Sequence, residues 1–398
     1  MQTLHPLDTL TALTEEQQEI RLLARDFGAR ELAPHAALWD RNAHFDASLI
    51  GKLGALGFLG MLVPEQYEGL GLSSLTYLVA LEEIAAADAS TAVMMSVHNS
   101  LPTQMLLRYG SETQRQRFLA PLARGALLGA FALSEPDAGS DAAALSTQAV
   151  RDGDHWVLSG TKSWVSAGGY AGVILAMART DSSEHRRGAR GISAFIITPD
   201  LPGFRVGKKE DKMGLRASST VQLVFDQMRV PADRLLGEEG HGFPYAVQSL
   251  EHGRLGIAAQ ALGIARAALE QSVAYARQRS QFGQPISEFQ GIQFKLADMA
   301  VRVTAARALL HATAAAKDRG EPVGAQASMC KLLASETAMW VTTQAVQVFG
   351  GYGYMKDYPV ERLFRDAKAT EIYEGASEIQ RLIIGKALAI HHTTSHSP

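Results

Sequence analysis

FALSEPDAGSD, residues 131–141, is the stretch at which the character of this 398-residue chain changes. Helix-compatible segments lie before it, and short β-like runs separated by Gly, Asp and Ser turns lie after it. The stretch is dense in hydroxyl and backbone donors, so it could wrap a polar cofactor. An ordinary interdomain loop would account for Pro136 and Gly139, but not for the hydroxyls of Ser134 and Ser140.

The sequence before this stretch predicts an all-α domain over residues 1–128. Thr14 and the following Glu-Glu-Gln look like a capping box, and apolar residues follow at helical spacing. A break or kink is expected at Pro102, because proline cannot continue the hydrogen bonding of a helix. Further helix-compatible segments cover residues 49–59, 75–87, 91–109 and 112–120.

The sequence after the stretch predicts two more domains. Residues 129–239 form a β-barrel-like domain, with β-like runs at 156–158, 173–177, 192–197 and 221–225. Residues 240–398 form a C-terminal four-helix bundle, with long Ala- and Leu-rich segments at 243–279, 289–318, 323–350 and 378–390. The expected fold class is therefore α+β and multidomain, with helical, β and helical domains in that order.

Composition excludes several classes of protein. The formal net charge of -3 gives no basic field for nucleic acid, and no Lys and Arg run forms a patch for a membrane surface. The single cysteine, Cys330, excludes disulfide scaffolds and multi-cysteine metal sites, and His-Glu-x-x-His is absent, so no metal is expected. The N-terminus is unlike a signal peptide, and no apolar run approaches the roughly 18 residues of a membrane span. We expect a cytoplasmic protein.

Trp164 and Ser166 provide a second cofactor signal. They are two residues apart, so they project from the same face of a strand. An indole beside a hydroxyl suits stacking on a flat heterocycle and hydrogen bonding to it. A tryptophan that is simply buried in the core is the competing explanation.

The strongest chemical signal is the glutamate cluster of residues 365–380. It places Glu371, Glu374 and Glu378 within eight residues, and Gly375 directly follows Glu374. The glycine permits a turn that can project the Glu374 carboxylate into a cavity before a helix that begins near residue 377. Glu371 and Glu378 are expected to form ion pairs or caps. A glutamate at a turn is usually only solvated, so spacing alone does not decide the role of Glu374.

Together these segments closely resemble the acyl-CoA dehydrogenase family. LSEPDAGSD at 133–141 and YEGASEIQR at 373–381 are similar to its two signatures. Other elements that look like the family's own, in their usual order, are GTKSWVS at 160–166, KMGLR at 212–216, Gly253-Arg254, RSQFG at 279–283, Gln290 and QVFGG at 347–351. The resemblance covers about Leu13 to Leu388. It implies the three-domain layout above, with FAD held between domains and across a subunit interface.

The resemblance also implies site residues. The isoalloxazine side of FAD is held by Phe131, Leu133, Ser134, Gly139, Ser140, Trp164 and Ser166. The diphosphate and adenosine are bound by Arg279, Phe282 and Gln290, with Gln347, Gly350 and Gly351 from a neighbouring subunit. Further flavin contacts are Ala376, Ser377 and Glu378, and the substrate positions are Ser140, Glu251, Gly253, Arg254 and Gly375.

Two departures from the family pattern bear on these assignments. Ala376 stands where many members have Thr, although branched-chain members resemble this sequence there. Some branches place the base on a helix at the position of Gly253. Because that residue is glycine here and Glu374 is present, the base is expected on the C-terminal loop.

The implied reaction is FAD-dependent oxidation of an acyl-CoA to a trans-2-enoyl-CoA. Glu374 takes the α-proton, the flavin accepts hydride from the β-carbon, and electron-transfer flavoprotein is the implied acceptor. Burial should raise the pKa of Glu374 toward operating pH. Residues 88–98 and Ala376 look like short-chain or short branched-chain members, which favours acyl chains of about four to six carbons. The implied pathways are fatty acid β-oxidation and branched-chain amino acid degradation, and the implied assembly is a homotetramer.

Three alternatives keep the fold and change the function. An acyl-CoA oxidase would pass its electrons to dioxygen, and the sequence does not exclude it. A flavin monooxygenase has no need of an α-proton base, so Glu374 argues against it. A non-catalytic FAD-binding regulatory relative that binds DNA should show a basic face or an extra domain, and neither the length nor the charge offers one.

Overall fold

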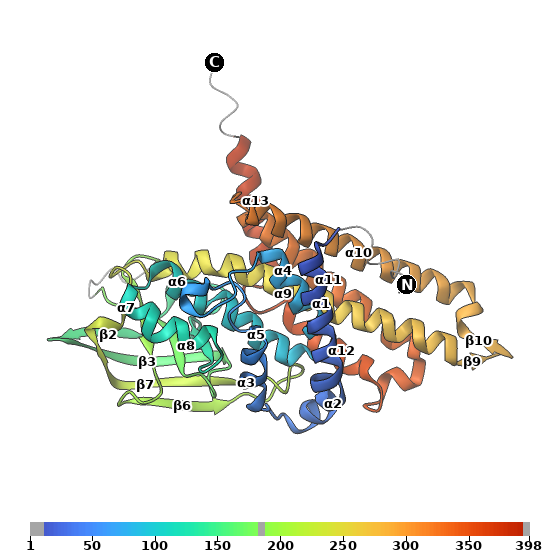
Figure 1. Ribbon diagram of the computed structural model, residues 1–398, viewed down its shortest axis with the longest axis horizontal. Helices are drawn as coiled ribbons and strands as arrows, with labels where there is room; N and C mark the ends of the chain where they lie inside the picture. The colour runs from blue at the N-terminus through green and yellow to red at the C-terminus, as the bar shows by residue number, and fades with distance from the viewer. Residues whose placement is uncertain (1–11, 182–187, 393–398) are drawn as a thin grey trace, which may run out of the picture.

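The structure is a computed structural model that describes residues 12–181 and 188–392. An N-terminal helical part, a central sheet and a C-terminal helical part follow one another, which confirms the expected fold class (Figure 1). The sheet lies at one end of the molecule, and the hairpin of β9 (Ser280–Gln281) and β10 (Gln284–Pro285) lies at the other. In these two ranges, no helix is both long and apolar enough to cross a membrane.

The N-terminal helices begin where the sequence indicates. Thr14 caps the first helix: its hydroxyl accepts from the Gln17 backbone N–H at 3.2 Å, and the Gln17 side chain accepts from the Thr14 N–H at 3.1 Å. The expected break at Pro102 separates the fifth and sixth helices. The helices are α1 (Glu15–Phe27), α2 (Ala33–Asn42), α3 (Ser48–Ala55), α4 (Ser74–Ala87), α5 (Ala89–Ser100), α6 (Pro102–Tyr109), α7 (Glu112–Gln114) and α8 (Ala120–Ala123).

The central sheet contains eight strands, and seven of them follow the order β6-β7-β3-β2-β4-β5-β8, with β1 paired to β4. Every residue of β4 and β5 is buried. Alternate residues of these two strands belong to two separate apolar clusters, one shared with α6 and α8 and the other with β3 and β7. Burial on both faces explains why these strands are continuous apolar runs. The strands are β1 (Gly129–Ala132), β2 (Gln148–Asp152), β3 (His155–Ser166), β4 (Val173–Arg179), β5 (Ile192–Ile197), β6 (Phe204–Lys209), β7 (Thr220–Pro231) and β8 (Leu235–Leu236).

The C-terminal part contains one helix that the sequence analysis missed. The four expected helices are present as α9 (Gly242–Gln278), α10 (Gln290–Asp318), α11 (Gly324–Phe349) and α13 (Ser377–His392). The additional helix is α12 (Pro359–Thr370), whose apolar residues Val360, Leu363, Phe364 and Ala367 recur at helical spacing, so its amphipathic pattern was present in the sequence. It ends just before the Glu374 turn and therefore positions that turn.

A buried ionic network joins the N-terminal helices to the bundle. Arg266 of α9 pairs with Glu82 at 3.1 Å and with Glu83 at 2.7 Å, both on α4. Arg307 of α10 also pairs with Glu82, at 2.5 Å. Burial alone would raise the pKa of Glu82, but the two guanidinium groups lower it to about 2. The network therefore stays charged and fixes α4 against α9, which carries part of the site.

Candidate active site

Glu374 lies in a strained turn between α12 and α13. Its φ is +52°, and that of Gly375 is +94°, so two successive residues are left-handed. A non-glycine residue in this region costs about 1–3 kcal/mol and persists only where the surroundings fix it. Lys331 Nζ donates to the Gly375 carbonyl at 2.9 Å, and Gln380 Nε2 donates to the same oxygen at 2.8 Å. The turn is thus held from both α11 and α13.

The Glu374 carboxylate packs against the backbone of α9 at Gly253. A Cβ atom on residue 253 would lie 1.8 Å from Glu374 Oε2 and 2.8 Å from its Cδ. Only glycine leaves room for the carboxylate there. The helix position at which some branches of the family carry a base is therefore adjacent in space to the carboxylate of Glu374.

Burial dominates the electrostatics of Glu374. Both carboxylate oxygens are buried, and neither has a hydrogen-bond partner among the described residues. Burial raises the pKa of Glu374 to about 7, against the opposing influence of Lys331 and Arg254. A carboxylate with this pKa is ionised in part near neutral pH and is a stronger base than a solvated one. The expected direction of the shift is confirmed.

The neighbouring glutamates have other roles. Glu371 forms an ion pair with Lys368 at 2.6 Å, in line with the expectation that it forms an ion pair or a cap. Glu378 is exposed in the first turn of α13, where an acidic side chain interacts favourably with the helix dipole. Glu251, on α9, pairs with Lys317 at 3.0 Å. Among these four glutamates, only Glu374 presents a buried carboxylate without a partner in the described structure.

Arg254 and two hydroxyls extend the site along α9. The Arg254 side chain is buried, and its Nε has no hydrogen-bond partner in the described part of the chain. One turn beyond Gly253, a Cβ on Gly256 would lie 2.4 Å from Ser96 Oγ and 3.4 Å from the Tyr77 hydroxyl. The two glycines therefore open one face of α9 toward buried polar groups from α4, α5 and the Glu374 turn.

The 131–141 segment is fixed to β3 by a buried ion pair. Lys162 Nζ contacts Glu135 Oε1 at 2.7 Å and the Leu133 carbonyl at 3.1 Å, and neither charged side chain is exposed. The other Glu135 oxygen accepts from Ser146, at 2.6 Å from its N–H and 2.7 Å from its hydroxyl. Backbone pairing between Ser163 N and Ser134 O at 2.9 Å completes the attachment. Ser134 and the Trp164 strand are thus held side by side.

Trp164 is exposed, so the alternative that it is a core tryptophan is wrong. It lies in an irregularity of the β3–β7 pairing between Lys162 and Val165, its φ is +55°, and 55% of the residue is accessible. Trp156, on the same strand, is the core residue. Gly139 and Ser140 are also exposed, whereas Phe131, Leu133 and Ser166 are half-buried. These positions form a surface that a flat ring system could cover.

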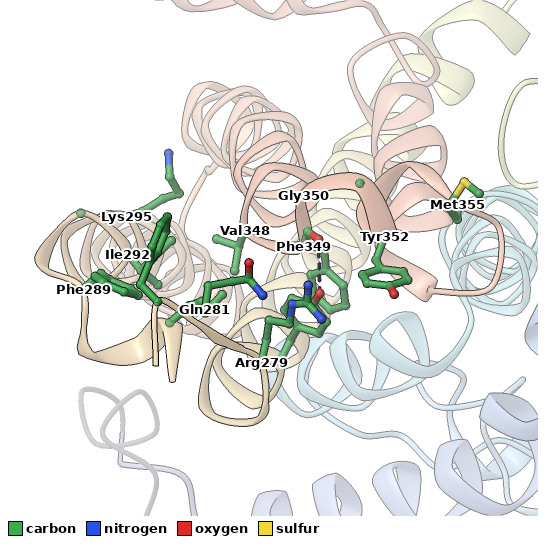
Figure 2. Close-up of a pocket in the computed structure, with 15 residues that line it drawn as sticks. Arg279, Gln281, Phe289, Ile292, Lys295, Val348, Phe349, Gly350, Tyr352 and Met355 are labelled. Carbon is green, nitrogen blue, oxygen red and sulfur yellow. Dashed lines mark hydrogen bonds between the residues drawn. The ribbon is translucent and has the colours of Figure 1, made fainter. Parts of the chain in front are cut away.

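A second group of expected cofactor residues lines a pocket of about 870 Å³ at the far end of the bundle (Figure 2). Arg279, Phe282, Gly350 and Gly351 all belong to it. The sequence analysis expected Gln347 to Gly351 to reach the cofactor from a neighbouring subunit, which a single chain does not test. Within one chain, the end of α11 and the β9–β10 hairpin line the same pocket, because α9 and α11 pack together. Gln347 and Gln290 are exposed beside the pocket without lining it.

The residues present fit a flavin cofactor. Phe282 is 94% exposed and has a φ of +52°, and Trp164 shares both properties. Large aromatic side chains held in strained, exposed conformations mark binding surfaces. Strand β3, which carries Trp164, and the β9–β10 hairpin, which carries Phe282, lie toward opposite ends of the molecule (Figure 1). No group of three or more metal-ligating side chains occurs within the residues that the structure describes.

The sequence matches three domain descriptions of one family. They are the acyl-CoA dehydrogenase N-terminal domain over residues 14–126, the middle domain over residues 130–228 and the C-terminal domain over residues 240–389. The chain belongs to the acyl-CoA dehydrogenase family, whose members are flavoprotein oxidoreductases.

Individual relatives within this family include enzymes named for short-chain substrates. The chain is 50% identical to the mitochondrial short-chain specific acyl-CoA dehydrogenase of Bos taurus, covering 96% of this chain and 92% of the relative. The structure of butyryl-CoA dehydrogenase from Megasphaera elsdenii superposes with a TM-score of 0.93 at 46% identity, covering 95% of this chain and 99% of that one. A chain in a structure described as the electron transferring flavoprotein of Acidaminococcus fermentans also gives 0.93 at 46% identity, with coverage of 95% and 98%.

The sequence analysis missed several residues of the site. Lys331 and Gln380 hold the Glu374 turn, and Tyr77 and Ser96 lie over Gly256. One signal was available: Lys331 interrupts an apolar helical run, where a charged residue is unusual. The hydroxyls of α4 and α5 carry no comparable local signal.

Proposed function

We propose that this chain oxidises short-chain acyl-CoA thioesters to trans-2-enoyl-CoA products, with Glu374 as the base and FAD as the cofactor. The main observation that supports this proposal is the position of the Glu374 carboxylate, which is buried over Gly253 without a hydrogen-bond partner among the described residues. A carboxylate without competing hydrogen-bond donors is free to accept a proton from a bound substrate. Relatives that act on short-chain acyl-CoA and butyryl-CoA support the substrate class.

The residues of this chain would divide the chemistry among them. Glu374 takes the α-proton of the thioester, which is weakly acidic and therefore requires a positioned base. Gly253 provides the space that the carboxylate occupies. Following the family pattern, the Glu374 backbone amide would donate to the thioester carbonyl and stabilise the developing enolate. Arg254 and Ser140 are further proposed substrate positions.

FAD would be held by both surfaces described above. The 131–140 segment, Trp164 and Ser166 would contact the flavin ring, together with residues 376–378. Arg279, Phe282 and Gln290, with Gln347, Gly350 and Gly351, would bind the diphosphate and adenosine. When bound, FAD supplies the acceptor for the β-hydride. Electron-transfer flavoprotein is the proposed acceptor of the electrons, in line with the structural neighbour that bears that description.

A homotetramer is the proposed assembly. Exposed apolar side chains occur on the two outer helices of the bundle: Phe294 and Val301 on α10, and Leu382 and Leu388 on α13. In Figure 1, α13 projects from the body of the molecule, where a neighbouring copy could pack on it. A monomer in solution that holds stoichiometric FAD would contradict this assembly.

The test is anaerobic mixing of the purified protein with a panel of acyl-CoA thioesters, following the loss of flavin absorbance. Butyryl-CoA and short branched analogues should reduce the flavin faster than palmitoyl-CoA. Preference should be graded, because each methylene in an apolar pocket contributes on the order of 1 kcal/mol. Much faster reduction by palmitoyl-CoA would overturn the substrate class. Rapid reoxidation by air would identify an oxidase instead.

A further inference from the structure

Lys331 is a buried cation that the reaction described above does not use. It lies in the N-terminal third of α11, it is 0% exposed, and its helix neighbours Ala327, Cys330 and Ala334 are buried too. Burying an ammonium group is costly unless it is paired or hydrogen-bonded. Here its hydrogen bond goes to the backbone carbonyl of Gly375, at 2.9 Å. The burial of a lysine whose hydrogen bond goes to a backbone carbonyl of the Glu374 turn therefore needs a functional explanation.

The Gly375 carbonyl oxygen accepts hydrogen bonds from two buried side chains. Gln380 Nε2 also donates to it, at 2.8 Å, and approaches the Glu374 carbonyl at 3.3 Å. The Gln380 side chain is buried as well. Two buried donors from different helices therefore fix the peptide between Gly375 and Ala376, one residue after Glu374, whose φ is +52°. The two donors differ in one respect, because only Lys331 is charged.

The charge of Lys331 also acts on the Glu374 carboxylate. Lys331 is the largest influence that opposes the burial-driven rise in the pKa of Glu374, ahead of Arg254. Burial in turn lowers the pKa of Lys331 to about 8, against the attraction of Glu374 and Glu371. The charged and titratable groups around this centre come from every packed element: Tyr77 of α4, Glu251 and Arg254 of α9, Lys331 of α11, Asp366 of α12, Glu371 and Tyr373 of the turn, and Glu378 of α13.

We propose that Lys331 is a positioning residue for the base, whose buried ammonium group fixes the Gly375 carbonyl and so holds the Glu374 carboxylate over Gly253. This inference rests on the proposed role of Glu374. Gln380 holds the same carbonyl without adding charge. Removing either donor should loosen the turn, but only the loss of Lys331 should also remove a cation from beside the carboxylate.

The experiment compares Lys331→Met, Lys331→Arg and Gln380→Leu with the unaltered holoenzyme. The first readout is the rate of flavin reduction by butyryl-CoA as a function of pH. The second is exchange of the α-protons of 3-thiabutyryl-CoA with D₂O, in which sulfur replaces the β-carbon so that no hydride can leave. Exchange reports proton removal alone. FAD content and the thermal midpoint are measured for every variant.

Lys331→Met should lower kcat by roughly 10- to 100-fold with KM changed only a few-fold, because a displaced base loses rate rather than binding. Its pH profile should shift toward higher pH by about one unit, since removal of a cation raises the pKa of a nearby carboxylate. Gln380→Leu should lower the rate without that shift. Lys331→Arg should restore the position of the profile and part of the rate.

Several outcomes would overturn the proposal. Lys331→Met with unaltered exchange and an unaltered pH profile would show that the lysine does not act on the base. Equal losses in Lys331→Met and Gln380→Leu at every pH would show a structural role only. Should Lys331→Met fail to fold, Lys331→Arg decides: its longer side chain must displace the Gly375 carbonyl, so undiminished exchange would refute positioning.

A parallel measurement on Glu374→Gln separates this inference from the proposed function. If Glu374→Gln retains α-proton exchange, Glu374 is not the base and both ideas fall. If Glu374→Gln loses exchange while Lys331→Met keeps it, the proposed function stands and only the role of Lys331 is wrong.

Discussion

The Glu374 turn and the Phe282 pocket are two halves of one proposed site that the chain builds in opposite ways. The Glu374 carboxylate is buried, and its turn is fixed by donors from α11 and α13 of the same chain. Phe282 is 94% exposed at the tip of a short hairpin. The comparison shows that the turn of the proposed base is held by contacts within one chain. The pocket presents its surface outward and would depend on a cofactor and a neighbouring subunit to cover it.

The most damaging change to the buried half is Glu374→Gln. Glutamine keeps the shape of the side chain but cannot accept the α-proton. We expect flavin reduction to fall by roughly 10²- to 10⁴-fold or more, with FAD content and acyl-CoA binding preserved. Anaerobic single-turnover mixing with butyryl-CoA measures this. Glu371→Gln, which only weakens the ion pair with Lys368, is the control and should keep substantial turnover.

Gly253→Ala tests whether the close approach to α9 matters for the base. The new Cβ would lie 1.8 Å from Glu374 Oε2, so the carboxylate must move. Displacement of a catalytic group by about 1 Å can cost on the order of 10² in rate, and we expect a loss of that size with FAD retained. Gly51→Ala on α3, where a Cβ would meet no atom within 4 Å, is the matched control. A full rate in Gly253→Ala would show that the carboxylate acts from another position.

The pH dependence of flavin reduction should report the buried carboxylate. Because burial raises the pKa of Glu374 to about 7, the basic form is lost as the pH falls through that value. The rate should therefore decline about tenfold per pH unit below it. Stability should change in the opposite sense: protonated Glu374 favours the folded state, and this contribution disappears as the pH rises from about 4.5 to about 7. A rate that is flat between pH 5 and pH 8 would contradict the assignment.

The smallest effect is expected in the exposed half, from Phe282→Ala. Loss of an aromatic surface should weaken FAD binding by about tenfold, while α-proton exchange by the protein saturated with FAD stays unchanged. Titration of the deflavinated protein with FAD measures the affinity. Tyr354→Ala is the control, since that side chain is 85% exposed but does not line the pocket. Equal effects of the two substitutions would remove the pocket from the FAD site.

Local sequence patterns predicted much of the molecule. The order of helical, β and helical parts follows from hydrophobic periodicity and turn residues, which depend only on near neighbours in the chain. The Thr14 capping box and the break at Pro102 were predictable for the same reason. Helix α12 was missed although Val360, Leu363, Phe364 and Ala367 carry a helical pattern, so this omission was not imposed by the sequence. Glu374 stood out only through the family signature that surrounds it, since a glutamate at a turn is ordinarily solvated.

The tertiary structure decided what surrounds those residues. Gly253 and Glu374 are far apart in sequence. Only the packing of α9 against the turn shows that residue 253 must be glycine to leave room for the Glu374 carboxylate. The contact of Lys331 with Gly375 and the exposure of Trp164 have the same origin. A sequence pattern records which face of a segment is buried, whereas burial of one particular atom depends on segments that meet only when the chain has folded. The family resemblance implied the role of Glu374 and the direction of its pKa shift, whereas the burial that causes the shift, and the opposing charges of Lys331 and Arg254, are visible only in the folded chain.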